Sequence, residues 1–353
     1  MNTPIAAVVL GGSGYVAGEL LRLIAGHPQL ELAAVMSDSR PGEPVAHAFP
    51  HLASAYGDTR FATQAVIEGQ LAELPAAAVF CAAPHGAAAP LIDALLSKAS
   101  AGGTRVHVVD ISADFRYRSA AEFESTYGQA HRVPARLGEF TCALPEHLPS
   151  PATSHIAHPG CFATATLLAA VPLLALKLAR PRLFVAGVTG STGSGRKPIE
   201  GTHHPLRHSD LYAYSALTHR HVPEIQACVR AACGVDADIA FVPHSGPFAR
   251  GIHVTVQAEL TAAHETAAVL AALRGFYAQA PFVRVLDTAP RIKNVVASNY
   301  AHLFAVANGR TVAVLCAIDN LTKGAAGGAV QWMNRLFNLP ETTGLSAPAA
   351  GWT

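Results

Sequence analysis

The sequence predicts an α/β protein with an N-terminal, doubly wound parallel sheet and a second domain of α+β type. Between residues 5 and 114, apolar strand-like runs alternate with stretches of helical composition, and right-handed crossovers place such helices on both faces of a parallel sheet. After about Pro151 the pattern changes to one long helical segment followed by longer strands. A chain of 353 residues is also longer than an ordinary domain with one hydrophobic core, so two domains are expected.

The elements of the first domain follow in a regular order. Strands are expected at 5–10, 30–36, 76–80 and 106–111, with helices at 19–25 and 88–98. In the second domain a helix is expected from Cys161, with strands at 183–188, 252–260 and 311–318 and helices at 224–232, 264–279 and 324–336. The predicted division is 1–157, 158–318 and a C-terminal helix and tail, 319–353, that returns to the first domain.

Composition narrows the classes of partner. Half of the residues are hydrophobic and the net charge is +1, which argues against a nucleic-acid surface and against a polybasic membrane anchor. The longest apolar run, 165–176, is about half of the ~20 residues that span a bilayer. The N-terminus shows no secretory signal and the six cysteines are scattered, so a cytoplasmic protein with reduced thiols and a small-molecule partner is expected.

A glycine-rich turn between the first strand and the first helix predicts a dinucleotide site, and hence a Rossmann-type domain. Gly12-x-Gly14-x-x-Ala17 fits the general fingerprint, and strand, turn and helix follow in the required order. A tight turn without ligand is the alternative interpretation. The cofactor-binding residues predicted at this turn are Gly11, Gly12, Ser13, Gly14, Tyr15 and Val16.

The end of the second strand bears on the choice of cofactor. Asp38 is of the type that binds ribose hydroxyls in NAD enzymes, whereas Arg40 with Ser37 and Ser39 can hydrogen-bond a 2′-phosphate. We favour NADP(H) because a guanidinium and two hydroxyls match a dianion. Asp38 must then point into solvent.

Cys161 follows a Pro-Gly turn and opens an apolar, helix-compatible run. The N–H groups and the dipole of a helix N-terminus stabilise negative charge, which favours the nucleophilic thiolate. A small buried hydrophobe is the alternative for this cysteine.

No metal site is predicted. Cys228 and Cys233 lack neighbouring ligands, and the histidines at 203, 204 and 208 are expected to form a polar surface or oligomer loop.

The ordered motifs give the chain a resemblance to the N-acetyl-γ-glutamyl-phosphate reductases, within the aspartate-semialdehyde-dehydrogenase-like family. They lie at 11–15, 19–23, 84–86, 112–116, 144–146, 159–164, 193–197, 219–225, 250–252, 298–299 and 318–327. The resemblance implies NADPH-dependent reductive dephosphorylation of N-acetyl-L-glutamyl 5-phosphate to the 5-semialdehyde, a step of arginine biosynthesis, by a homodimer or homotetramer. It also implies that the second domain is catalytic and carries the oligomer interface.

The same resemblance assigns roles to particular residues. Cys161 maps to the nucleophile and His219 to the acid/base group, which protonates an oxyanion or keeps the thiolate poised. A cysteine nucleophile and a histidine acid/base group both suit the reduction of an acyl phosphate by way of a thioester. Pro84, His85, Gly86, Gly193 and Asn320 are expected at the cofactor. Arg116, Arg196, Lys197, Arg220, His221 and Glu224 are the candidates for binding substrate, although Arg220 and His221 equally suit orienting neighbours.

The chain departs from the family pattern near the nucleophile. Cys142-Ala143 replaces Tyr-Gly, Phe162 replaces the common Tyr, and Ala163 stands where Pro is typical, so the acyl group is less closely defined than the reaction. A carrier-protein-linked aminoadipyl or glutamyl phosphate reductase of lysine synthesis is the second interpretation. A non-catalytic NADP-binding redox sensor and a thiol hydrolase are further alternatives.

Overall fold

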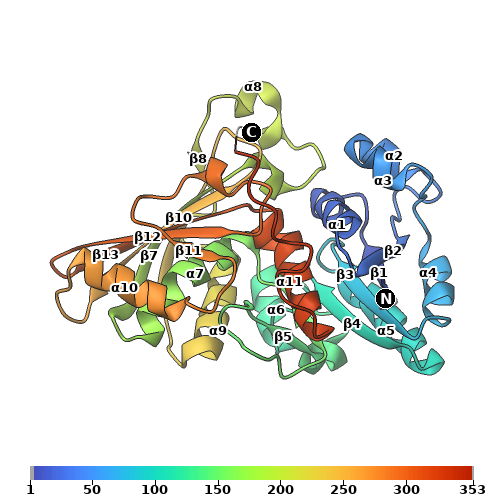
Figure 1. Ribbon diagram of the computed structural model, residues 1–353, viewed down its shortest axis with the longest axis horizontal. Helices are drawn as coiled ribbons and strands as arrows, with labels where there is room; N and C mark the ends of the chain where they lie inside the picture. The colour runs from blue at the N-terminus through green and yellow to red at the C-terminus, as the bar shows by residue number, and fades with distance from the viewer. Residues whose placement is uncertain (1–3, 352–353) are drawn as a thin grey trace. The chain divides into compact units, whose positions relative to one another are not determined.

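The computed structural model describes residues 4–351 and forms two compact units (Figure 1). Unit 1 combines the chain through Cys142 with residues 150–158 and 326–346. Unit 2 combines residues 143–149 and 159–325 with the segment that starts at Ala347. The division 1–157, 158–318 and 319–353 stays a prediction, while contacts place residues 143–149 with unit 2 and 326–346 with unit 1.

Unit 1 is built on a six-stranded sheet of order β2-β1-β3-β4-β6-β5 in which every pairing is parallel. The order reverses between β1 and β3, and ligands of open α/β sheets collect at the carboxyl ends of strands at such a point. The strands are β1 (Ile5–Leu10), β2 (Leu30–Val35), β3 (Ala76–Cys81), β4 (Arg105–Asp110), β5 (Phe140–Cys142) and β6 (His155–Ala157).

Helices cover both faces of this sheet, as the alternation of the sequence predicts. α1 and α11 pack together, α1 against β1 and β2 and α11 against β4, while α4 and α5 pack together with α5 on β4. The helices and short turns of unit 1 are α1 (Tyr15–Ala25), α2 (Val45–Ala48), η1 (Pro50–Leu52), α3 (Ala53–Tyr56), α4 (Gln64–Leu71), α5 (Ala88–Gly102), α6 (Ala120–Tyr127), η2 (Pro134–Glu139) and α11 (Gly327–Leu336).

Unit 2 is built on a seven-stranded mixed sheet of order β11-β12-β13-β10-β7-β9-β8. The central strands β12, β13, β10 and β7 are antiparallel neighbours, whereas β7 and β9 run parallel. The strands are β7 (Ala179–Thr189), β8 (Tyr212–Ala213), β9 (Asp238–Ser245), β10 (Ile252–Leu260), β11 (Val283–Val285), β12 (Ala301–Asn308) and β13 (Thr311–Ile318).

One face of this second sheet carries the helices (Figure 1). α7 packs on β7, β10 and β13, α9 on β9, and α10 on β11 and β12. Buried and exposed residues alternate along β7 and β10, as expected of strands with one covered face. The helices and short turns are α7 (Cys161–Ala175), η3 (Ser191–Ser194), η4 (Glu200–Thr202), α8 (His204–Arg207), α9 (His221–Cys233), α10 (Thr266–Phe276), η5 (Ile292–Asn294) and the π-helical turn η6 (Thr322–Ala326).

The predicted fold class is confirmed in both units. β1 has the expected bounds, and α5, α7, β10 and β13 begin where the sequence predicts them. β9 and β12 were not expected, because their alternating pattern is interrupted by Pro243 and His244 in β9 and weakened by small residues in β12.

Candidate active site

Cys161 is the first residue of α7 and is partly exposed. Gly160 is the N-cap residue, with an extended backbone and no side-chain hydrogen bond to the helix end, and its carbonyl accepts the N–H of Thr164 at 2.7 Å. Cys161 therefore stands at the start of α7, the end of a helix that favours negative charge.

Cys161 opens into a pocket of about 500 Å³ formed within unit 2. Predicted site residues meet there from three stretches of sequence, and hydroxyl-bearing side chains are numerous. The lining consists of Cys161, Phe162, Thr189, Gly193, Ser194, Ile199, Tyr212, Tyr214, Ser215, Thr218, His219, Arg220, His221 and Ser245. A soft nucleophile, imidazoles, a guanidinium and hydroxyl groups are the set that covalent acyl chemistry on an anionic substrate needs.

The tautomer of His219 follows from its backbone contact. Its Nδ1 accepts the N–H of His221 at 3.2 Å, so neutral His219 carries its proton on Nε2. Burial, with Arg220 adding to it, lowers the pKa of His219 from 6.5 to about 4. At neutral pH the ring is therefore an uncharged donor through Nε2 and not a base at that atom.

Tyr214 and His221 complete the surroundings of His219. The His219 ring lies 4.6 Å from that of His221 and 5.7 Å from that of Tyr214, both edge to face. Burial, and secondarily charge on Cys161, raises the pKa of Tyr214, so its hydroxyl stays protonated. Tyr214 was not predicted from the sequence, because it lies outside the recognised motifs.

Glu224 is fully buried and fixes the turn before the nucleophile. Its Oε1 accepts the N–H of Gly160 at 2.6 Å. This contact makes Glu224 a positioning residue. The predicted direct contact of Glu224 with substrate stays a prediction, and it is not the contact observed.

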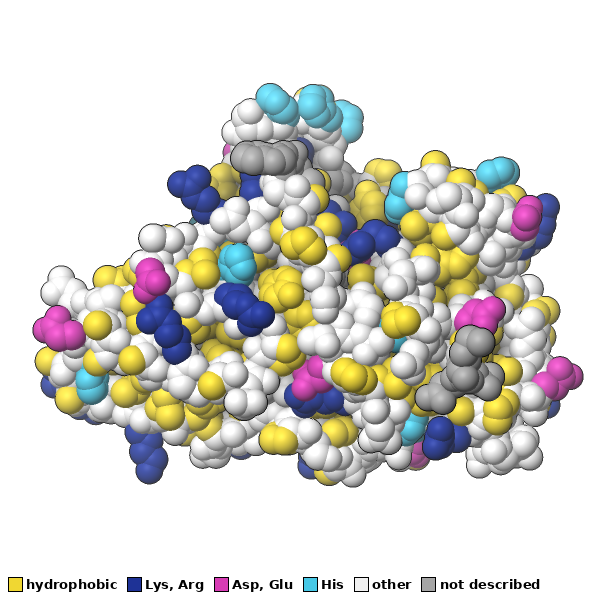
Figure 2. Space-filling view, in the orientation of Figure 1, with side chains coloured by type: hydrophobic (Ala, Val, Ile, Leu, Met, Phe, Trp, Pro, Cys, Tyr) yellow, Lys and Arg dark blue, Asp and Glu magenta, His cyan; other side chains and the backbone are white. Residues whose placement is uncertain are grey.

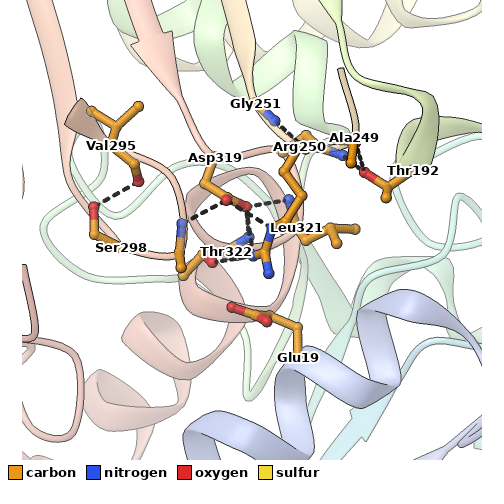
Figure 3. A network of polar contacts seen from close by, with 12 residues as sticks. Glu19, Thr192, Ala249, Arg250, Gly251, Val295, Ser298, Asp319, Leu321 and Thr322 are labelled. Carbon is orange, nitrogen blue, oxygen red and sulfur yellow. Dashed lines mark hydrogen bonds and ion pairs between the residues drawn. The ribbon is translucent and has the colours of Figure 1, made fainter. Parts of the chain in front are cut away.

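A second polar network holds the segment that follows β13 (Figure 3). Asp319, with no exposed surface, accepts hydrogen bonds from the Nε and a terminal nitrogen of Arg250 at 3.0 Å each. It also accepts the N–H groups of Ala297, Leu321 and Thr322 at 2.7–2.8 Å. Five donors on one carboxylate fix the turn that leads into η6.

The glycine turn of unit 1 fits a dinucleotide. Gly11 has φ +75°, and a Cβ there would lie 2.5 Å from the backbone nitrogen of Ala83; a Cβ on Gly12 would lie 2.4 Å from the Val35 side chain. A Cβ on Gly14 would meet nothing within 4 Å, so the N-terminus of α1, which Gly14 opens without a side-chain cap, faces free space. Two glycines are needed for packing, and the third leaves open space of the kind that an anion at a helix N-terminus requires.

Hydroxyl groups link that turn to the loop after β2. Ser39 Oγ lies 3.3 Å from both Ser13 Oγ and Ser37 Oγ. Arg40 is partly exposed and pairs with Glu43 at 3.0 Å, while Asp38 is exposed. This arrangement fits a 2′-phosphate, which would pair with Arg40 in place of Glu43. An ion pair between such exposed side chains contributes little to stability.

The Pro84–Gly86 loop is held by Asp114, in the loop that follows β4. Asp114 accepts the N–H of Gly86 at 2.8 Å and that of Ala89 at 2.9 Å, so it also caps the start of α5. Gly86 has φ +79°, a backbone conformation that favours glycine. His85 packs against Tyr127, with ring centroids 5.6 Å apart.

Most of the other predicted residues make contacts away from the pocket around Cys161. Arg116, in unit 1, donates from Nε to the His158 carbonyl at 3.1 Å and from a terminal nitrogen to that of Ile111 at 3.0 Å. Arg196 and Lys197 follow η3 but lie outside the pocket lining. Asn320, 2% exposed, accepts the N–H of Gly251 and donates to Thr192 Oγ1. Their roles, and that of Gly193 at the cofactor, stay predictions.

The histidines at 203, 204 and 208 are exposed at α8, and Figure 2 shows a group of histidine side chains over that helix. On the face in view, side chains of both charges are scattered among hydrophobic and neutral ones. That distribution agrees with the near-zero net charge.

Comparison with known proteins defines the class first. The model for the semialdehyde dehydrogenase NAD binding domain matches residues 6–153, and that for the semialdehyde dehydrogenase dimerisation domain matches residues 161–320. In solved structures the fold is similar to aspartate semialdehyde dehydrogenase II of Vibrio cholerae complexed with ASA (TM-score 0.70, 14% identity, 96% of this chain and 99% of that one). It is also similar to the Candida albicans enzyme with NADP (TM-score 0.64, 13% identity, covering 95% and 99%).

Sequence relatives define the family within that class. The N-acetyl-gamma-glutamyl-phosphate reductase of Ectopseudomonas mendocina is 41% identical over 349 residues, 97% of this chain and 98% of the relative. That of Heliobacterium modesticaldum is 37% identical over 355 residues, with the same coverage. The chain belongs to the N-acetyl-gamma-glutamyl-phosphate reductase family, as its motifs predict.

Proposed function

We propose that this chain reduces N-acetyl-L-glutamyl 5-phosphate to N-acetyl-L-glutamate 5-semialdehyde and releases phosphate, a step of arginine biosynthesis. The observation that carries the proposal is Cys161 at the N-terminus of α7, in one pocket with His219 and Arg220. The names of the relatives support this substrate over the carrier-linked alternative. A redox sensor would need neither the pocket nor its imidazoles.

Cys161 is the nucleophile of the proposed reaction. Its thiolate adds to the acyl carbon, the C–O bond to phosphate breaks, and the acyl group is left as a thioester on sulfur. The first turn of α7 stabilises the thiolate before attack. Arg220, exposed in the pocket lining, supplies positive charge for an anionic group of the substrate.

His219 serves as a donor in this mechanism. Because its Nδ1 accepts the His221 N–H, the proton on Nε2 is available to an oxyanion on the acyl carbon. The same proton prevents Nε2 from deprotonating Cys161. Of the two roles expected from the sequence, the geometry favours oxyanion stabilisation over keeping the thiolate poised.

The glycine turn and the Ser37–Arg40 loop would hold NADP(H), with the pyrophosphate at the start of α1 and the 2′-phosphate at Arg40. When bound, NADPH supplies the hydride that reduces the thioester to the aldehyde. Gly86 and Ala89, fixed by Asp114, shape the neighbouring loop.

We also propose that two copies pair through the open face of the unit 2 sheet, in keeping with the dimerisation domain that the family model describes. Val306, Ala313, Gln257 and Phe184 lie in one row across that face, from β12 to β7. Phe184 is 49% exposed and Val306 43%, an apolar surface suited to a partner.

A cytoplasmic location of the enzyme agrees with its six free cysteines. Among the described residues, no helix is long and apolar enough to cross a membrane.

The reverse reaction tests the proposal, since the acyl phosphate is unstable. N-acetyl-L-glutamate 5-semialdehyde, NADP⁺ and phosphate should together give NADPH, and omission of phosphate should stop turnover. Cys161→Ser should abolish this turnover, whereas the matched control Cys233→Ser, at a cysteine of similar exposure at the far end of α9, should keep it. Absence of turnover with this aldehyde, in a folded enzyme that binds NADPH, would reject the substrate assignment.

A further inference from the structure

The π-helical turn η6 forms the wall directly behind the nucleophile. A Cβ built on Gly324 would lie 2.8 Å from the Cβ of Cys161 and 3.1 Å from its Cα. The N–H of Gly324 bonds to the Asp319 carbonyl at 2.9 Å, five residues back, which is the spacing of a π-turn. A displacement of η6 would therefore move Cys161.

Lys323, in the same turn, is completely buried and paired with a buried acid. Its Nζ lies 2.6 Å from Oε1 of Glu146, and the side chains are 0% and 1% exposed. The ammonium also lies 5.8 Å from the centre of the Phe282 ring. The cost of removing both charges from water offsets most of the attraction between them. Apolar side chains of similar volume would stabilise the fold to the same degree. Stability alone does not account for two charges at this place.

The residue after Glu146 is linked to α7, the helix that Cys161 begins. His147 Nε2 lies 2.9 Å from the Tyr277 hydroxyl, which donates to the Leu168 carbonyl of α7 at 2.7 Å. That carbonyl lacks its helical donor, because Pro172 four residues later has no N–H. Burial, opposed by the charge of Glu146 and assisted by that of Lys323, lowers the pKa of His147 to about 4, so a neutral imidazole makes the contact.

The Glu146–His147 segment is thus joined to both elements that meet at Cys161. Glu146 holds η6 from one side, and His147 holds α7 through Tyr277. At its start, the same η6 segment is fixed by Asp319 and Arg250 (Figure 3). The two anchors leave η6 little freedom to move relative to α7.

We propose that the buried Glu146–Lys323 pair is a positioning device that sets η6 against Cys161 and so fixes the direction of thiolate attack. Neither side chain lines the pocket, so neither is a catalytic residue. The proposal rests on the nucleophilic role of Cys161 proposed above. It concerns geometry and not substrate identity, and can be tested without the substrate.

The test compares Lys323→Met, Glu146→Gln and the double variant Lys323→Met/Glu146→Met. Breaking the pair by Lys323→Met leaves a buried carboxylate, so a large drop in the unfolding midpoint is expected for this variant. The double variant removes both charges and should recover most of the midpoint. Glu146→Gln keeps the shape and an acceptor for Lys323, and removes only the negative charge of the pair.

Two readouts separate positioning from stability. The rate of Cys161 alkylation by iodoacetamide, with Cys161→Ser as the blank, needs no substrate, and kcat and KM follow from the reverse assay. We expect the folded double variant to show a kcat reduced about tenfold to a hundredfold at similar KM. Its rate of Cys161 alkylation should also differ from that of the wild type. Glu146→Gln should change both readouts in the same direction.

Wild-type kcat and wild-type alkylation in the double variant would overturn the proposal and leave the pair a structural contact. The same result in Glu146→Gln would overturn it even if the double variant did not fold. Inactivity of the wild-type enzyme towards the aldehyde would instead reject the proposed function. The alkylation comparison would still decide whether the pair positions Cys161.

Discussion

The carboxylate of Glu224, on α9, accepts the backbone N–H of Gly160, the residue before the nucleophile, at 2.6 Å. Glu224 has no exposed surface, and Gly160 is the N-cap of the helix that Cys161 begins. This hydrogen bond aligns the Pro-Gly turn so that α7 starts at the thiol. The placement of Cys161 therefore depends on a residue 63 positions later in the sequence.

Replacing Glu224 should uncouple the turn from α9. Glu224→Ala leaves the Gly160 N–H unsatisfied, which costs about 1–3 kcal/mol of unfolding free energy. Misplacement of Cys161 should reduce kcat about tenfold to a hundredfold. Denaturant unfolding and the reverse assay measure the two effects, and Glu224→Gln, which keeps an acceptor, should retain more activity. Equal loss in both variants would point to a role for the charge itself.

The proposed donor role of His219 predicts how kcat/KM depends on pH. Because the pKa of His219 is lowered to about 4, the group stays neutral from pH 5 to 8 and should cause no limb near 6.5 in kcat/KM. Removing the donor by His219→Phe should reduce kcat about a hundredfold or more. His204→Asn, an exposed histidine of α8, is the control. A limb near pH 6.5 that disappears in His219→Phe would contradict the donor role.

His155 should make the fold sensitive to acid. Burial lowers the pKa of His155 to about 4, and its Nδ1 accepts the N–H of Val108. The unfolded chain therefore binds a proton from about pH 6.5 downwards that the folded chain resists, so stability falls as the pH drops from 6.5 to 4. Asp110, whose pKa burial raises to about 7, has the opposite effect.

A difference measurement isolates His155 from Asp110. Between pH 7 and pH 4, wild type should lose unfolding free energy relative to His155→Gln, which carries no titrating ring. Chemical denaturation at several pH values gives this difference directly. A difference that does not change with pH would show that His155 is not buried as a neutral ring.

Arg40 should determine the preference for NADP(H). Arg40→Ala removes the guanidinium expected at the 2′-phosphate, and the loss of a charge-assisted hydrogen bond, about 1.5–3 kcal/mol, should raise the KM for NADP⁺ roughly tenfold to a hundredfold. The KM for NAD⁺ should not change. Glu43→Gln releases Arg40 from its ion pair and should lower the KM for NADP⁺ slightly. A parallel rise in both KM values for Arg40→Ala would place the 2′-phosphate elsewhere.

The open face of the unit 2 sheet should tolerate charge poorly if it is a subunit interface. Phe184→Glu places a carboxylate at the β7 end of the exposed row and should shift the protein to monomers in sedimentation velocity. Leu206→Glu, at an exposed leucine of α8, is the control for added charge on a surface. An unchanged sedimentation coefficient for Phe184→Glu would reject this face as the interface.

Local patterns were enough to predict the turn from β1 into α1 and the helix that Cys161 opens, because each depends on residues close together in the sequence. The joint presence of Cys161, His219 and Arg220 in one pocket was expected from motif order and not from local pattern. Lys323 and Glu146 were not predicted as site residues, because a lysine in a glycine-rich stretch resembles an exposed cation. Its burial results from packing between segments 177 residues apart.

The most direct test of the account is a rapid-mixing experiment without phosphate. Aldehyde and NADP⁺ should give a burst of one NADPH per subunit and leave an N-acetylglutamyl group on the peptide that contains Cys161, because the thioester has no acceptor. Added phosphate should release the acyl group and start turnover, and Cys161→Ser should show neither burst nor adduct. Continued turnover without phosphate, or a full burst in Cys161→Ser, would contradict the thioester mechanism.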